Sequence, residues 1–308
     1  MNSNSLVFDL ANGYTDGYNN CVMKKYVVSL NDSIDLKKIA DSGQCFRWKE
    51  ITDGTFRVTA FGMVRYFTRV DDHTITIDCD ESEYQNVWKD YLDIDTDYDR
   101  IIASIDSGDI FLTNAGDYGR GIRILRQDPL ETLITFIISQ RKNIPAIKSC
   151  VEKLCAACGT YIGQFDGDEV YAFPSLVQLS GLSCEKCGGE FCSYKKAGMD
   201  SCSLGYRMPY IQETVSRLVM NPDLLEYMMQ LDDKALYEEL LGFKGVGKKV
   251  ANCTALFGFH RLDFFPIDVW IKRVIDDVYG GSFDDRRYSP YAGVIQQYMF
   301  YYGRSEGI

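Results

Sequence analysis

The spacing of apolar residues changes once along the chain, near residue 83, and this change limits the available folds. Residues 25–80 contain segments such as FRVTAFG, RYFTRV and TITIDC, rich in β-branched and aromatic residues and separated by glycine or Asp-Asp turns. From residue 83 onward, apolar residues recur three and four positions apart, as in PLETLITFIISQ and VWIKRVIDDVY. We therefore predict an α+β chain, with a small antiparallel sheet lobe on a mostly α-helical body.

The charge of the chain restricts the function classes. The formal net charge is -11, which argues against a protein that coats nucleic acid non-specifically, because such binding rests on neutralising phosphates. The acidic residues crowd into 71–109, however, so a local DNA-binding face is not excluded. The N-terminus lacks a signal-peptide pattern, and no apolar run approaches the roughly 20 residues that span a bilayer. We expect an intracellular protein without a membrane partner.

The stretch GFKGVGKKVANC, residues 242–253, joins two helical patterns through a glycine-rich link. Glycines allow positive φ and close backbone approach, and the first amides of a helix are a ready anion site. A hairpin of this kind can hold a DNA phosphate by backbone N–H groups. We therefore expect Gly245, Gly247 and Lys248 to contact DNA.

Two lysines at the start of this helix are electrostatically unexpected, since the helix dipole disfavours cations there by roughly 0.3–1 kcal/mol. The simpler interpretation is that both amines reach solvent or a phosphate. The alternative is that the positive terminus and burial lower the pKa of one amine and make it a nucleophile at neutral pH. The next helix starts at PIDVW, where Asp268 is a natural N-cap, a role that would suffice to explain it.

Five motifs, in order along the chain, resemble those of the helix–hairpin–helix DNA glycosylases, most closely the 8-oxoguanine DNA glycosylase/lyase branch. They are SGQCFRW (42–48), ILRQDPLETLITFIISQRKNI (124–144), LGYR (204–207), GVGKKVANC together with PIDVWIKRV, and PYAGVIQQYMF (290–300). The resemblance implies an N-terminal extension (1–25), an N-terminal α+β domain (26–120) with a TBP-like sheet, and a helical catalytic domain (121–308). The mixture of residues is more similar to prokaryotic members, so we expect the cytoplasm or nucleoid of a prokaryote.

By this resemblance, Lys249 is the catalytic lysine and Asp268 the catalytic aspartate. An amine that attacks C1′ of the nucleotide forms a Schiff base, which makes the 3′ C–O bond open to β-elimination. A carboxylate beside C1′ stabilises the positive charge that develops on the sugar. The resemblance thus implies a DNA N-glycosylase with lyase activity, active on 8-oxoguanine in duplex DNA, that requires no cofactor for catalysis.

The resemblance also implies a pocket for the everted base. Gly43 would offer its carbonyl to N7–H, the hydrogen that distinguishes 8-oxoguanine from guanine. Phe300 would stack on the base, Gln296 would bond its Watson–Crick edge, and Cys253 would form the opposite wall. Taken singly, Gly43 is simply a turn glycine and Phe300 a core aromatic residue.

Further residues are implied to bind the DNA around the lesion. Tyr206 and Arg207 resemble the residues that wedge into the duplex, although a helix-start aromatic beside a solvated arginine is the simpler interpretation. Arg141 and Asn143 fall where relatives read the base opposite the lesion. Arg141 departs from the asparagine of eukaryotic members, so the resemblance does not fix the opposite-base preference. We expect a monomer whose partner is duplex DNA containing an oxidised purine.

A cysteine-rich insert, residues 181–203, interrupts the helical region. Cys184 and Cys187 form a C-x-x-C pair, and Cys192 and Cys202 could complete four thiolates for a structural zinc ion. The alternative is free thiols, because the second pair lacks this spacing. Two other functions remain open: a related glycosylase for another damaged base, such as an alkylpurine, and a non-catalytic helix–hairpin–helix DNA-binding module.

Overall fold

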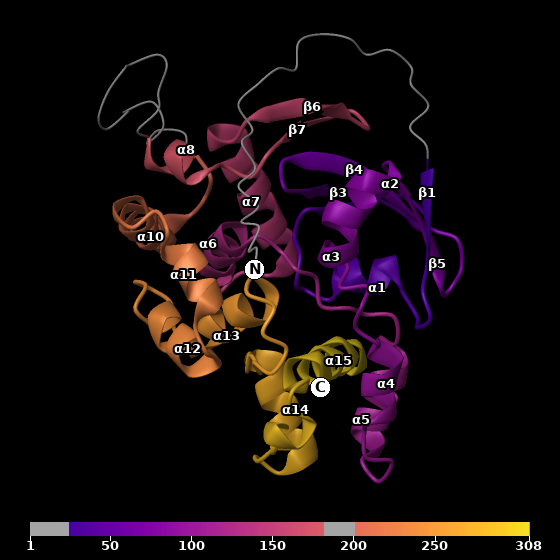
Figure 1. Ribbon diagram of the computed structural model, residues 1–308. Coiled ribbons are helices and arrows are strands. Elements are labelled where there is room, and N and C mark those ends of the chain that lie inside the picture. Colours follow the sequence, from indigo (N-terminus) through magenta and orange to yellow (C-terminus); the bar gives the residue numbers. More distant parts are fainter. Residues whose placement is uncertain (1–24, 182–200, 308) are drawn as a thin grey trace, which may run out of the picture.

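The computed structural model describes residues 25–181 and 201–307, and its N-terminal part contains the predicted antiparallel sheet (Figure 1). Five strands pair in the order β1-β5-β4-β3-β2, and all of the pairings are antiparallel. One core cluster lies on this sheet and includes the fully buried Trp88 and Phe67. The strands are β1 (Lys25–Ser29), β2 (Trp48–Thr52), β3 (Thr55–Ala60), β4 (Met63–Arg69) and β5 (Thr74–Asp78).

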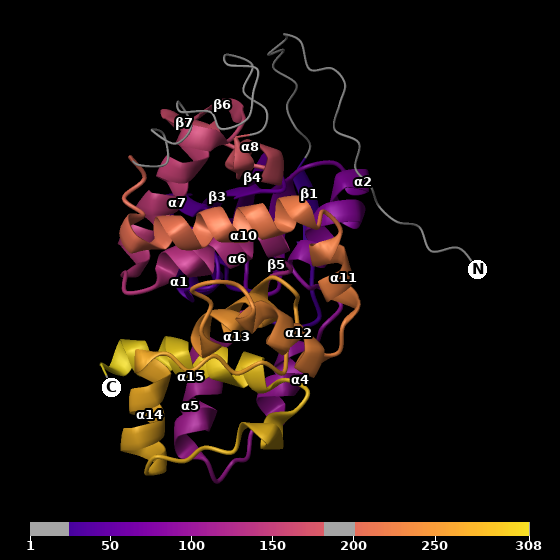
Figure 2. The same ribbon diagram turned by 90° about the vertical axis from the view of Figure 1, so that its left-hand side faces the viewer.

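The rest of the chain is mostly helical, as predicted, and encloses a second, larger core cluster (Figures 1 and 2). Near the sheet lie α1 (Leu36–Asp41), α2 (Glu81–Glu83), the π-helical turn η1 (Tyr84–Trp88) and α3 (Lys89–Tyr91). The helical body contains α4 (Tyr98–Ala103), α5 (Ile110–Gly119), α6 (Pro129–Ser139), α7 (Ile144–Cys158), α8 (Leu176–Ser180), the 3-10 turn η2 (Gly205–Arg207), α10 (Met208–Met220), α11 (Leu224–Gln230), α12 (Asp233–Leu241), α13 (Lys248–Phe257), α14 (Val269–Tyr279), the 3-10 turn η3 (Asp285–Tyr288) and α15 (Ala292–Glu306).

A β-hairpin that the sequence analysis did not predict follows α7. Its strands are β6 (Tyr161–Phe165) and β7 (Asp168–Tyr171), joined at Asp166-Gly167. Asp-Gly between two short alternating segments is a strong local hairpin signal, and it was outweighed by the helical patterns on both sides. The Arg57 guanidinium of β3 donates to Asp166 (3.1 Å) and Asp168 (2.8 Å), so ion pairs join the hairpin to the sheet.

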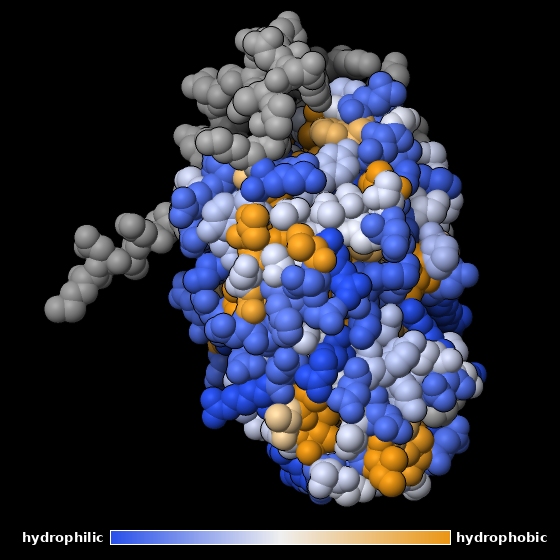
Figure 3. Space-filling view, turned by 90° about the vertical axis from the view of Figure 1, so that its right-hand side faces the viewer, coloured by the Kyte–Doolittle hydropathy of each residue, from blue (hydrophilic) through white to orange (hydrophobic). Residues whose placement is uncertain are grey.

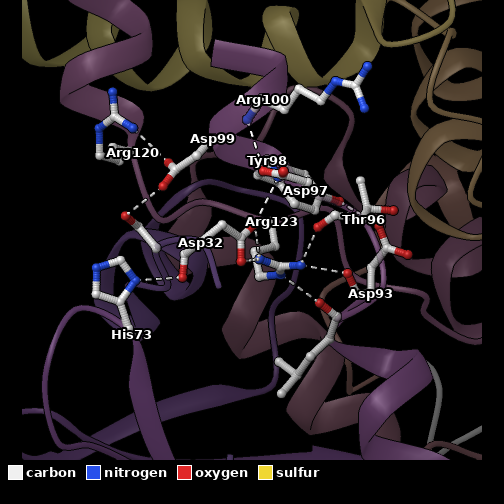
Figure 4. Close-up of polar contacts among 12 residues, drawn as sticks. Asp32, His73, Asp93, Thr96, Asp97, Tyr98, Asp99, Arg100, Arg120 and Arg123 are labelled. Atoms are coloured by element: carbon white, nitrogen blue, oxygen red, sulfur yellow. Dashed lines mark hydrogen bonds and ion pairs between the residues drawn. The ribbon is translucent and has the colours of Figure 1, made fainter. Parts of the chain in front are cut away.

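A buried arginine fixes the segment that passes from the sheet lobe into the helical body (Figure 4). Arg123 is fully buried, and one guanidinium nitrogen donates to both carboxylate oxygens of Asp32 (2.7 and 2.8 Å). Its other nitrogens donate to the carbonyls of Leu92, Asp93 and Thr96. Because every donor group of the guanidinium has a partner, burial of the charge is compensated, and the extended segment after residue 121 is held in one position.

The C-terminal helix α15 is supported from two sides. It packs against α5 and α14, and Figure 1 shows α5 beside it. The Tyr279 hydroxyl of α14 donates to Asp109, the N-cap of α5 (3.0 Å). This support matters because α15 carries the predicted base-recognition residues Gln296 and Phe300.

The net charge is separated from the predicted DNA-binding hairpin. Residues 71–109 contain 13 Asp and Glu against two Lys and Arg, which equals the whole formal charge of -11. In Figure 1 the elements of this segment (β5, α2 and α4) lie on the right, whereas α10, α12 and α13 lie on the left. The right-hand face is largely hydrophilic, with apolar side chains in separate small groups (Figure 3). The acidic balance therefore does not conflict with DNA binding at the helical hairpin.

A small cavity between the sheet and α6 holds an acidic side chain whose ionisation should destabilise the fold. The cavity is lined by Glu131 together with Arg47, Trp48 and Asp128. Burial raises the pKa of Glu131 to about 7; Arg47 opposes the shift, and Asp128 adds to it. The pKa of Glu131 is higher in the folded protein than in the unfolded chain, so folding favours the protonated carboxyl. The contribution of this group to stability is therefore present at low pH. It is lost as the pH rises through about 7.

We predict that Glu131→Gln stabilises the protein at pH 8 by about 1–2 kcal/mol, a rise of a few degrees in melting temperature, and has little effect at pH 5. Thermal melts of both proteins at the two pH values test this. Glu226→Gln is a matched control, since Glu226 also lies in the first turn of a helix but is exposed. A variant less stable than the parent protein at pH 8 would contradict the prediction.

Candidate active site

The predicted helix–hairpin–helix consists of α12, the glycine-rich link and α13. Gly245 has φ +79°, and a Cβ there would lie 2.2 Å from the Tyr210 ring, so only glycine fits. Gly247 is the N-cap of α13 and has no side chain to cap the helix. The first amides of α13 are therefore open to an anion, and Lys248 beside them is exposed.

Asp268 is the N-cap of α14, as its position before an apolar helix predicted. Its Oδ1 accepts hydrogen bonds from the backbone N–H groups of Trp270 (3.0 Å) and Ile271 (2.9 Å). Both bonds end on the same oxygen, so capping does not use Oδ2. The carboxylate can therefore act as a cap and still present an oxygen to a ligand.

One pocket brings together the six residues that were predicted for catalysis and base recognition. Lys249 and Asp268 lie in its wall, although they are 19 positions apart in the sequence. The base-recognition residues Gly43, Cys253, Gln296 and Phe300 line the same pocket, and the remaining lining residues are Ser42, Phe136, Phe257, Pro266 and Gln297. The pocket is thus assembled from the 42–43 turn, α6, α13, the start of α14 and α15.

The surroundings of the Lys249 amine are largely apolar. Its Nζ lies 5.0 Å from the centre of the Phe136 ring, and no carboxylate oxygen in the described part of the chain lies within 4.0 Å of it. The Cys253 side chain is buried, and burial raises the pKa of its thiol, opposed by the nearby Lys249. Cys253 therefore remains a neutral wall residue rather than a competing thiolate nucleophile.

The recognition side of the pocket presents acceptors that are unused. Gly43 has φ +77°, and a Cβ at this position would lie 3.3 Å from the Phe300 ring. Gln296 is 4% exposed, and its Oε1 has no hydrogen-bond partner among the described residues. Because Gln296 also lines the pocket, this unpartnered acceptor is available to a hydrogen-bond donor of a bound ligand.

The predicted DNA-contacting residues differ in exposure. Tyr206 is exposed at the start of η2, and Arg141 is exposed with φ +53° in the turn between α6 and α7. Asn143 is exposed and caps α7 by accepting from Ala146 N (3.0 Å). Arg207 is instead buried and donates to the carbonyls of Gln140 and Leu204. In this structure Arg207 thus supports the turn beneath Tyr206, and its contact with DNA stays a prediction.

The predicted zinc ligands Cys184, Cys187 and Cys192 lie outside the described residues, and Cys202 is buried. Within residues 25–181 and 201–307, no group of three or more His, Cys, Asp or Glu side chains could hold a metal ion. The same ranges contain no helix long and apolar enough to cross a bilayer.

Five of the lining residues were not predicted as site residues, and two of them show what signal the sequence offered. Phe136 belongs to the apolar pattern of α6, and nothing local distinguishes it from a core residue. Gln297 follows Gln296 in an otherwise apolar segment of α15, and both are buried. Two adjacent glutamines on a buried helix need hydrogen-bond partners, which was a usable signal for the second one.

Comparisons with known proteins identify relatives of the chain. Residues 26–133 match a family model described as the 8-oxoguanine DNA glycosylase N-terminal domain. A probable N-glycosylase/DNA lyase from Methanothermobacter thermautotrophicus is 31% identical over 62% of this chain and 66% of that relative.

Solved structures extend the similarity over most of the fold. A structure of MBOgg1 with a low-affinity DNA ligand is 33% identical, with a TM-score of 0.81 over 92% of this chain and 96% of that one. A Clostridium acetobutylicum 8-oxoguanine glycosylase/lyase, bound to duplex DNA with cytosine opposite the lesion, is also 33% identical. Its TM-score is 0.79 over 92% of this chain and 99% of that chain. The chain therefore belongs to the 8-oxoguanine DNA glycosylase family of helix–hairpin–helix glycosylases.

Proposed function

We propose that the chain is a bifunctional DNA repair enzyme that excises 8-oxoguanine from duplex DNA and then nicks the abasic site. The observation that carries the proposal is the shared pocket of Lys249 and Asp268, which also holds the unpartnered Gln296 acceptor. A phosphate-binding module has no use for an amine and a carboxylate in one pocket. That argues against the non-catalytic alternative.

The proposed reaction begins when the damaged nucleotide leaves the base stack and enters the pocket, at a cost of a few kcal/mol. The C1′–N9 bond then breaks, and the carboxylate of Asp268 stabilises the positive charge on the sugar. The Lys249 amine, reacting as the free base, forms a bond to C1′ and loses a proton, while the departing base gains one. The nitrogen lone pair then forms the Schiff base as the C1′–O4′ bond of the sugar ring breaks and O4′ takes up a proton. Loss of a C2′ proton expels the 3′ phosphate, which nicks the strand.

Recognition of the base depends on which groups of the base donate hydrogen bonds and which accept them. The Gly43 carbonyl accepts from N7–H of 8-oxoguanine, where guanine has only an acceptor. Gln296 bonds the Watson–Crick edge, and the base stacks between Phe300 and the neutral Cys253. A pocket built to accept a hydrogen bond discriminates strongly against a base that lacks the donor, because its buried carbonyl is then left unpaired.

DNA is held by the parts of the surface that surround this pocket. The open amides of α13, with Gly245, Gly247 and Lys248, take a phosphate. Tyr206 enters the duplex beside the everted nucleotide and is supported from below by Arg207. Arg141 and Asn143 lie on the turn between α6 and α7 and face the opposite strand.

A panel of duplexes with one lesion each tests the function. We expect the purified protein to release 8-oxoguanine and to cleave the strand at that site, with little action on alkylpurines or undamaged guanine. Release of an alkylpurine in preference to 8-oxoguanine would favour a related glycosylase, and binding without release would favour a DNA-binding module. Pairing the lesion with each of the four bases measures the opposite-base preference.

Three further properties belong to the proposal. The insert either holds a structural zinc ion through Cys184, Cys187, Cys192 and Cys202 or carries free thiols, and elemental analysis of protein purified under reducing conditions distinguishes the two. The protein acts as a monomer, and it works in the cytoplasm or nucleoid of a prokaryote. None of the three bears on the pocket chemistry, which needs no cofactor.

A further inference from the structure

We infer that Gln297 and Arg304 of α15 are positioning residues that set base specificity, because they fix the turn of residues 41–44 and leave its Gly43 carbonyl as the acceptor for the base. The inference rests on the proposed function and concerns residues outside the predicted site. The role assigned to this pair is to hold the backbone that reads the base, without contacting DNA themselves.

Three of the four carbonyls of this turn are bound by side chains. Arg304 donates to the Asp41 carbonyl (2.9 Å), Gln297 donates to the Ser42 carbonyl, and Gln127 donates to the Gln44 carbonyl (2.9 Å). The Gly43 carbonyl accepts no hydrogen bond from any residue in the described part of the chain. The side chains around the turn thus satisfy its other acceptors and leave the carbonyl of Gly43, which lines the pocket, without a partner among the described residues.

The turn is also anchored through two of its own side chains. The Ser42 hydroxyl donates to the Ile39 carbonyl (2.8 Å) at the end of α1. The Gln44 side chain donates to the Arg123 carbonyl (2.8 Å) and accepts from Leu125 N (2.8 Å). These bonds tie the turn to the extended segment that Arg123 holds in place.

Gln297 and Arg304 connect the turn to the helix that forms the stacking wall. Gln297 is 2% exposed and follows Gln296 directly. The Arg304 guanidinium lies 5.5 Å from the centre of the Phe300 ring. One helix therefore sets both the position of the stacking ring and the direction of the carbonyl opposite the base edge.

Loss of the Gln297 donor has two consequences. The Ser42 carbonyl is left buried without a partner, and the adjacent peptide can rotate to relieve this. Rotation turns the Gly43 carbonyl away from N7–H, so the pocket loses the interaction that favours 8-oxoguanine. The step at an abasic site involves no base and does not depend on this carbonyl.

The test compares two reactions of the same full-length protein. Single-turnover release of 8-oxoguanine from a duplex measures base recognition, and borohydride trapping on a preformed abasic site measures the lysine chemistry without a base. We expect Gln297→Met to slow base release by about tenfold or more while trapping at the abasic site changes less than about twofold.

Arg304 provides a second, less buried position. Arg304→Met should lower the ratio of the rate of base release to the rate of trapping at the abasic site. Arg304→Lys, which keeps a donor for the Asp41 carbonyl, should restore most of this ratio. Tyr298→Phe is the matched control on α15, because it removes a buried hydroxyl that has no hydrogen-bond partner among the described residues. It should leave the ratio unchanged.

Equal losses in both reactions, or an unchanged ratio in Gln297→Met and Arg304→Met, would overturn the inference in favour of a purely structural role. If Gln297→Met does not fold, the Arg304 pair decides between these outcomes. A parent protein that releases no 8-oxoguanine but traps on abasic sites would overturn the proposed substrate, and with it this inference. If only the inference is wrong, the parent protein still releases 8-oxoguanine.

Discussion

Lys249→Gln is expected to abolish covalent trapping on an 8-oxoguanine duplex and to lower base release by a factor on the order of 10³ or more. Glutamine has similar length but no nucleophilic amine, so neither the bond to C1′ nor the Schiff base can form. The surroundings of Lys249, with Phe136 at 5.0 Å and the neutral Cys253 thiol, offer no other nucleophile of comparable reactivity. Borohydride reduction followed by denaturing electrophoresis measures the adduct directly.

Lys248→Gln is the matched comparison, because it removes an amine from the same helix start at an exposed position. It should weaken DNA binding and make binding less sensitive to salt, yet still give full trapping at saturating enzyme. Trapping that survives in Lys249→Gln would show that another amine performs the chemistry. Trapping lost only in Lys248→Gln would move the catalytic role to that residue.

The periodicity of the sequence was sufficient to predict the antiparallel sheet and the helical body. The hairpin of β6 and β7 was missed because it is short and lies between two strong helical patterns. It is stabilised by contacts made far away in the sequence, such as those of Arg57 with Asp166 and Asp168. Ion pairs of this kind become visible only when the two segments are placed side by side.

The candidate site, like the fold, could be predicted from the sequence only in part. Lys249 and Asp268 each had a sufficient local explanation, as a solvated amine and a helix cap, and only the family resemblance singled them out. The structure adds that both line one pocket. The buried position of Arg207 and the Gln297 bond to the Ser42 carbonyl, which joins residues 255 positions apart, depend on tertiary packing and have no sequence signal of their own.

Asp268 combines two roles that a single substitution can separate. Its Oδ1 caps α14 through two backbone N–H groups, a role worth about 1 kcal/mol in typical helices. Its charge beside the pocket has a different task, namely to stabilise the cationic sugar. An amide keeps the first role and removes the second, since asparagine is as good an N-cap as aspartate.

We therefore predict that Asp268→Asn lowers single-turnover release of 8-oxoguanine by about 10²-fold or more and leaves the melting temperature nearly unchanged. Asp268→Ala should lose activity to a similar extent and also lose about 1 kcal/mol of stability, because the amides of Trp270 and Ile271 then have no cap. Rates and melting curves of the two variants, measured side by side, distinguish the roles. Retention of activity by Asp268→Asn would assign the aspartate to the helix cap alone, and the positive charge on the sugar would then have to be stabilised by another group in the pocket.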